Sequence, residues 1–132
     1  MINTNFNLNL VKTDESGETK EETVKVVIQE ISPFRVADIM SGAMNVNSGQ
    51  YNVGILAESF ISEVVVSPKN LKERIEGADN AMDAITKVVM EVRNFCDNPR
   101  KYALLQTESA IKSQSMVNGN TESNIDGSQE NV

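Results

Sequence analysis

The sequence predicts an α+β fold, in which an N-terminal antiparallel β-hairpin packs on a compact bundle of four to five helices. Two stretches near the N-terminus, residues 3–12 and 23–31, have the alternating or β-branched apolar residues that are typical of strands. Beyond residue 32, apolar residues recur every three or four positions, which is typical of helices. The clearest helical stretch is residues 78–96, and we expect the core to form against it.

The length and the composition predict one domain with a polar tail. A chain of 132 residues is long enough for a modest hydrophobic core, which we place in a single α+β domain at residues 1–112. Residues 113–132 consist mainly of Ser, Asn, Gln, Gly, Thr and Glu and lack apolar periodicity. They are expected to form a disordered C-terminal tail, because they cannot bury enough apolar surface to offset the entropy lost on ordering.

The hairpin is predicted from two strands that are neighbours in the sequence. Residues 3–12 alternate between apolar residues and mostly polar ones, and residues 23–31 are β-branched and apolar. Residues 14–22 between them are polar or charged, which indicates a loop and favours antiparallel pairing. On the first strand, Phe6, Leu8 and Leu10 should lie on one side, and on the second strand, Val24, Val26 and Ile28 could share one face.

Two helices are predicted to follow the hairpin. Ser32 and Pro33 are typical of a helix start, because a serine side chain can cap the first turn and proline suits the first helical position. This helix should run to Met44, with its apolar residues mostly inward, namely Phe34, Val36, Ala37, Met40 and Met44. After the turn-rich residues 45–52, helical spacing resumes, and the expected core face of that helix is Val53, Leu56, Ala57, Phe60, Ile61 and Val64.

The segment after the second helix has two interpretations. The three valines at residues 64–66 favour an extended backbone, and a residue before proline, here Ser67, is disfavoured in a helix. The segment is therefore either a short extended stretch or the end of the preceding helix. Residues 70–76 are then expected to form about two helical turns, which Gly77 ends.

The longest predicted helix, residues 78–96, has an apolar stripe with steps of four and three residues. Its members are Ala78, Met82, Ile85, Val89, Val92 and Cys96, and Ala81, Val88 and Phe95 widen it on one side. Val89 lies at the centre of this stripe, so we expect it to be buried. A last helix is predicted at residues 100–112, with Tyr102, Leu105 and Ile111 as its apolar residues.

Residues with the chemistry of a catalytic or metal site are scarce. The chain has no histidine and one cysteine, Cys96, which excludes a Cys–His pair and a zinc site built from several thiolates. No glycine-rich phosphate-binding motif is present, and the cluster Asp14, Glu15 and Glu18 lacks the spacing of a calcium-binding hand. We therefore expect no enzymatic activity, no cofactor and no metal, and a packing role for Cys96.

The charge and the hydropathy favour protein partners. The net charge is −7, and such an acidic chain repels the phosphate backbone of nucleic acids. No apolar run is long enough to cross a membrane and the N-terminus lacks a signal-peptide pattern, so we expect a soluble intracellular protein. The candidate partner-binding residues are Met90, Val64, Val65, Val66 and Tyr102. The sequence leaves self-association open.

The order of parts from residue 53 to residue 102 resembles the tail assembly chaperones of long-tailed bacteriophages. An amphipathic helix leads into EVVVSPK at residues 63–69, and a short charged segment and a long helix reaching VRNF at residues 92–95 follow. In that family an apolar V-x-x-P turn follows the helix that crosses the middle of the domain. The small size, the acidity and the polar C-terminal tail are also similar.

The resemblance implies a non-enzymatic function in the host cytoplasm. Such chaperones bind the tape measure protein, a long helix-rich chain, and deliver tail tube subunits during tail assembly. The resemblance supplies no catalytic residue and no mapped binding residue. Two alternatives stay open: a structural tail or capsid-completion protein of the phage particle, and an acidic inhibitor that mimics nucleic acid. The second alternative requires carboxylates concentrated on one folded face.

Overall fold

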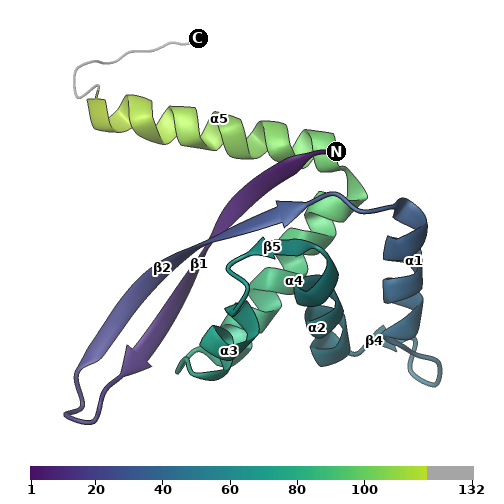
Figure 1. The fold of residues 1–132 in the computed structure, drawn as a ribbon, viewed down its shortest axis with the longest axis horizontal. Helices are drawn as coiled ribbons and strands as arrows, with labels where there is room; N and C mark the ends of the chain where they lie inside the picture. The colour runs from purple at the N-terminus through teal and green to yellow at the C-terminus, as the bar shows by residue number, and fades with distance from the viewer. Residues whose placement is uncertain (119–132) are drawn as a thin grey trace.

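Within residues 1–118, an antiparallel hairpin is followed by five helices, so the predicted α+β class is confirmed (Figure 1). The structure, a computed structural model, describes residues 1–118 and the side chains of residues 1–111. The strands are β1 (Asn3–Thr13), β2 (Thr19–Gln29), β3 (Met44–Asn45), β4 (Gln50–Tyr51) and β5 (Val65–Ser67). The helices are α1 (Pro33–Gly42), α2 (Val53–Glu63), α3 (Leu71–Glu76), α4 (Ala81–Asp97) and α5 (Pro99–Asn118).

The main sheet has the strand order β1-β2-β5, and both pairings are antiparallel. Phe6 lies opposite Val26 and Leu8 opposite Val24, and the apolar residues predicted to share a side on each strand are all buried. The third strand, β5, decides between the two interpretations of the valine-rich segment, which is extended and pairs with β2. The extended conformation is favoured because the added strand supplies hydrogen-bond partners for backbone groups on the outer edge of β2.

The hairpin is longer than the sequence predicts. β2 begins at Thr19, so its first residues pair with the end of β1 instead of belonging to the loop. Those residues are polar and exposed, and Figure 1 shows this end of the hairpin projecting beyond the helices. A strand is recognisable from apolar alternation only where one of its faces is buried. The polar start of β2 has no such alternation, so it could not be predicted from the sequence.

The first helix buries a different face from the one predicted. Ser32 caps α1 as expected, but Phe34, Ala37 and Met44 are exposed, whereas Ile39 and Ala43 are buried. α1 has apolar residues all round and packs mainly on α2, so the sequence could not show which side faces the core. The prediction for these residues was therefore wrong.

The buried face of α4 is rotated by roughly one residue from the predicted stripe. The residues facing the core are Ala84, Val88, Val92 and Phe95. Val89 is half-buried and Met82 is exposed, so the predicted centre of the stripe and the inward position of Met82 were wrong. α4 packs on both β1 and α2, so its buried face is set by the position of two neighbouring elements.

The turn before α4 fixes where this helix begins. The backbone N–H of Asp79 donates to the Val11 carbonyl over 2.7 Å. The Asn80 side chain accepts from the Val11 N–H at 2.9 Å and donates to the Asn9 carbonyl at 2.9 Å. The turn thus covers part of the free edge of β1. Without such a cover, the edge strand could pair with a strand of another molecule.

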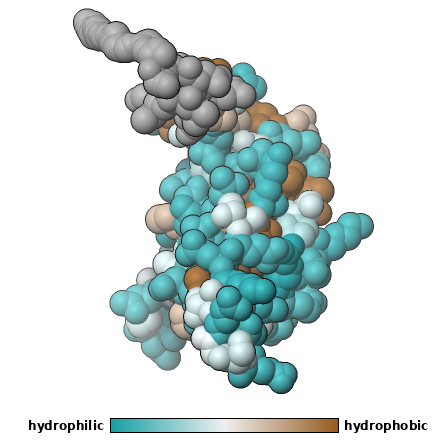
Figure 2. All heavy atoms as spheres, turned by 90° about the vertical axis from the view of Figure 1, so that its left-hand side faces the viewer, coloured by the Kyte–Doolittle hydropathy of each residue, from teal (hydrophilic) through white to brown (hydrophobic). Residues whose placement is uncertain are grey.

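The last helix extends further than predicted. α5 continues to Asn118, so the predicted boundary at residue 112 falls inside it. The remainder of the predicted disordered tail, residues 119–132, lies outside the described residues. No helix within residues 1–118 is sufficiently long and apolar to pass through a lipid bilayer. Figure 2 shows a mainly hydrophilic surface on the side of the hairpin tip, with hydrophobic residues in small areas.

Candidate functional site

Helices α2 and α3 border a groove that also touches β5 and α4. It consists of two hollows of about 290 Å³ and 590 Å³ that share Glu58, Ile61 and Lys72 in their linings. The smaller hollow lies between α2, α3 and α4, and the larger one extends to β5. We call this the α2–α3 groove, and its lining residues are Gly54, Ala57, Glu58, Ile61, Ser62, Val65, Val66, Pro68, Lys69, Lys72, Glu73, Ile75, Glu76 and Ile85.

The lining of the smaller hollow is largely apolar. Ala57 and Ile61 come from the flank of α2, and Ile75 and Ile85 come from α3 and α4. Ala57 and Ile75 are buried in the core, and Ile61 and Ile85 are partly buried against it, so the hollow lies at the edge of the packing between the three helices. An apolar concave surface of this kind suits the side chains of another polypeptide better than a polar metabolite.

Charged residues surround the groove. Lys72 Nζ lies 2.6 Å from Glu58 Oε2, and both side chains are about half-exposed. This hydrogen bond with Glu58 raises the pKa of Lys72 above its ordinary value. An exposed ion pair contributes little to stability, so a partner can displace it at small cost. Glu73 and Glu76 add further carboxylates, so the rim presents both signs of charge.

The structure brings two of the five candidate partner-binding residues to this groove. Val65 and Val66 line its larger hollow. Val64 and Tyr102 are buried in the core, so they cannot contact a partner, and the prediction for them is corrected. Val64 is enclosed because it joins α2 to β5, where its carbonyl accepts from the Gln29 N–H at 3.0 Å. Met90 is exposed on α4 and is not among the lining residues of the groove.

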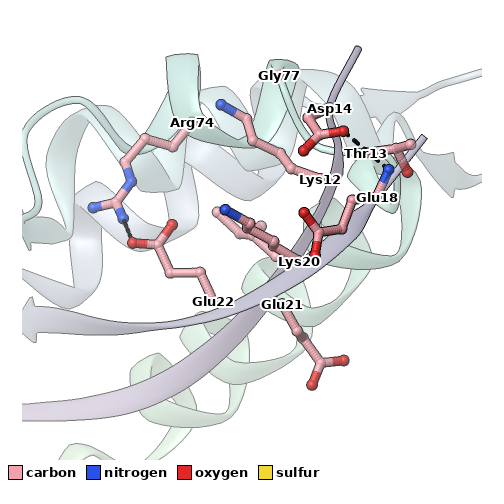
Figure 3. Close-up of a pocket in the computed structure, with 10 residues that line it drawn as sticks. Lys12, Thr13, Asp14, Glu18, Lys20, Glu21, Glu22, Arg74 and Gly77 are labelled. Carbon is pink, nitrogen blue, oxygen red and sulfur yellow. Dashed lines mark hydrogen bonds and ion pairs between the residues drawn. The ribbon is translucent and has the colours of Figure 1, made fainter. Parts of the chain in front are cut away.

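A second pocket, of about 670 Å³, lies under the hairpin tip next to α3 (Figure 3). Its charged residues are of both signs, and Arg74 Nη2 lies 2.6 Å from Glu22 Oε2. Hydrogen bonds from the Ser16 hydroxyl and the Glu18 backbone N–H lower the pKa of Asp14. Asp14 thus closes the hairpin loop, and no group of three metal-binding side chains occurs in the part of the chain that the structure describes.

Cys96 lies half-buried on α4. Burial raises the pKa of its thiol to about 11, and nearby Asp97 acts in the same direction. Since the thiolate is the reactive form, the thiol is almost entirely protonated and unreactive at neutral pH. This environment agrees with the packing role expected from the sequence.

The sequence did not single out Glu58, Ile61 and Lys72 as site residues. A weak signal exists for Ile61, which follows Ala57 by four residues on the flank of α2, but that spacing is equally typical of a core face. Lys72 comes from another helix, 14 positions away from Glu58. Only the folded chain brings the two sides of the groove together.

No family model matches the sequence, and neither the curated proteins nor the solved structures yield a match.

Proposed function

We propose that the protein is a non-enzymatic tail assembly chaperone of a long-tailed bacteriophage. In this proposal it binds an apolar helical segment of the tape measure protein in the α2–α3 groove, in the host cytoplasm, and delivers tail tube subunits as a second partner. The groove carries the proposal, because it combines an apolar hollow with rim charges of both signs. No cofactor or metal takes part.

Helix-in-groove recognition explains why such a groove suits this client. An amphipathic helix places its apolar anchors at spacings of three, four and seven residues, and these anchors fill an apolar hollow. The binding energy comes mainly from the apolar area removed from water. The rim residues Lys69, Lys72 and Glu73 can then pair with the polar flanks of the client, which fixes its direction and register.

The position of the V-x-x-P turn also supports the proposal. The segment that carries the family resemblance folds into β5 and the following proline, and Val65, Val66 and Pro68 all line the groove. The residues on which the resemblance to tail assembly chaperones rests are therefore part of the groove that we propose for the client.

The two alternatives have less support. Glu22, Glu58, Glu63 and Glu91 each lie within ion-pair distance of a lysine or arginine, whereas a nucleic-acid mimic needs unpaired carboxylates gathered on one face. Detection of the protein in purified virions would distinguish a structural protein of the particle from a chaperone.

Replacing Val66 by Glu should reduce binding of the tape measure protein by roughly tenfold or more, which corresponds to about 1.4 kcal/mol. The change places a carboxylate in the larger hollow, where a bound apolar helix would bury it. The measurement is co-purification of the two proteins, with the tape measure protein taken as the product of the longest neighbouring gene. Val46→Glu is the matched control, because Val46 is 91% exposed and does not line the groove.

Equal losses for Val66→Glu and Val46→Glu would argue against the groove as the binding site. The chaperone proposal itself would be abandoned if the wild-type protein does not bind the tape measure protein and is found in mature virions.

A further inference from the structure

Helix α5 is attached to the domain only near its N-terminal end. Tyr102 is buried, its ring packs edge-on against Phe95 and its hydroxyl donates to Glu91 at 2.5 Å. One turn later, the Gln106 side chain donates to the Asn5 carbonyl at 2.8 Å. Figure 1 shows the helix continuing past β1, with no other described element drawn alongside its second half. The first turns of α5 therefore hold a longer helix that projects from the domain.

The face of α5 turned away from the domain is apolar. Leu104, Leu105 and Ile111 are 60%, 52% and 61% exposed. Because a helix advances by 100° per residue, Leu104 and Ile111 lie opposite the side that carries Tyr102 and Gln106, and Leu105 lies about 60° from Tyr102 at the edge of the exposed side. The sequence marks Tyr102, Leu105 and Ile111 as the apolar residues of this helix, and of the three only Tyr102 is buried. Leu104 and Leu105 are adjacent on the exposed side and Ile111 lies seven residues beyond Leu104, and exposed large apolar residues of this kind indicate an interaction surface.

Two charged residues flank these leucines on the same face. Lys101 precedes Leu104 by three positions and Glu108 follows it by four, so all three lie on one side of the helix. Both charged side chains are exposed, and no ion pair involving either occurs among residues 1–111. Along α5, a positive residue is therefore followed by the leucines and then by a negative residue. Two copies of this helix surface are complementary in charge when the helices run antiparallel.

We propose that α5 pairs with α5 of a second copy of this chain in an antiparallel, two-fold symmetric dimer. A two-fold axis between Leu104 and Leu105 brings the leucines of both copies together at the centre. The same axis sets Lys101 of each copy opposite Glu108 of the other, which gives two attractive contacts per dimer. A parallel pair would instead place like charges side by side.

The interface is small, so the dimer should be weak. It rests on three aliphatic residues and one charge pair from each copy, which is below the size of a standard stable interface. None of these residues lines the α2–α3 groove, so dimer formation and client binding can each fail without the other. The dimer would present two client-binding grooves at once, which raises the apparent affinity for a client with repeated apolar segments.

Analytical ultracentrifugation of the full-length protein at about 100 µM tests the proposal, since a micromolar dimer is mostly formed at that concentration. The wild-type mass should approach twice the 14.5-kDa chain mass. Lys101→Glu and Glu108→Lys should each weaken the dimer by roughly tenfold, because two attractive contacts become repulsive. Leu105→Asp should give a monomer, because it places two like charges at the apolar centre.

Restoring variants identify the antiparallel arrangement. The double variant K101E/E108K should dimerise like the wild type, and an equal mixture of the two single variants should form a heterodimer of similar strength. Thermal unfolding followed by circular dichroism serves as the folding control, since the substituted side chains are exposed. A monomeric wild type would overturn the proposal. The exposed side of α5 would then have another occupant, such as a client helix or residues 119–132. A dimer that the single charge reversals leave unchanged would overturn it as well.

Discussion

Val88→Asp is expected to unfold the domain. The Val88 side chain is fully buried on the face of α4 that packs against the core. An aspartate there would bury an unpaired carboxylate, at a cost of several kcal/mol. That cost is a large part of the 5–15 kcal/mol by which a domain of this kind is usually stable. Far-UV circular dichroism and a thermal melt at neutral pH should show loss of the cooperative transition.

Two other α4 variants control for the charge itself. Thr86→Asp places the same carboxylate on the exposed side of the helix and should leave the protein folded. Val89→Asp should be intermediate, because Val89 is half-buried. The sequence stripe, with its centre at Val89, predicts the opposite order for the two valines. A melt in which Val89→Asp is more damaging than Val88→Asp would therefore contradict the observed core face.

Phe95→Ala is expected to lower the free energy of unfolding by about 3–5 kcal/mol, the usual range for a buried phenylalanine. Phe95 is fully buried, and its ring centroid lies 5.6 Å from that of Tyr102 in an edge-to-face arrangement. The substitution leaves a cavity in the core and also removes the surface on which the start of α5 packs. Urea unfolding measures the change as a shift in midpoint.

The chain contains a matched control for this substitution. Phe34 lies on α1 and is 84% exposed, so Phe34→Ala should change the stability by no more than about 0.5 kcal/mol. The sequence predicts both phenylalanines to be inward. Similar losses for the two variants would show that the α1 face described above is wrong.

The parts of the fold that the sequence could predict are those where one face of an element is buried. The apolar alternation around Leu8 and Val26 correctly identified the buried face of the hairpin, because a strand shows its core side in every second residue. The Ser32–Pro33 start of α1 was also correct, because capping is local chemistry. Neither feature depends on how distant elements pack.

Other features depend on contacts that a linear pattern cannot show. An apolar stripe on α4 that includes both Val88 and Val89 does not show which valine is buried, since that depends on how α4 packs on β1 and α2. The same reason explains why Phe34 was misplaced on α1. On α5, the apolar residues of the sequence did not distinguish the buried Tyr102 from the exposed Leu105 and Ile111, because apolar spacing is identical whether a helix faces its own core or a partner.

The candidate site was predictable only in part. Val65 and Val66 were singled out from the sequence, and both line the α2–α3 groove. The ion pair between Glu58 and Lys72 joins residues of different helices, so nothing in either local sequence indicated it. Grooves between helices arise from tertiary packing, and their residues carry no common sequence signal.

Site-specific photo-crosslinking from residue 66 tests the central claim most directly. A photoreactive phenylalanine analogue is introduced in place of Val66, and in a separate variant in place of the exposed Val46, and each protein is co-expressed with the tape measure protein. If the α2–α3 groove holds a client helix, irradiation should crosslink the tape measure protein from position 66 and not from position 46. Crosslinking from neither position, or equally from both, would contradict the proposed binding of a client in this groove.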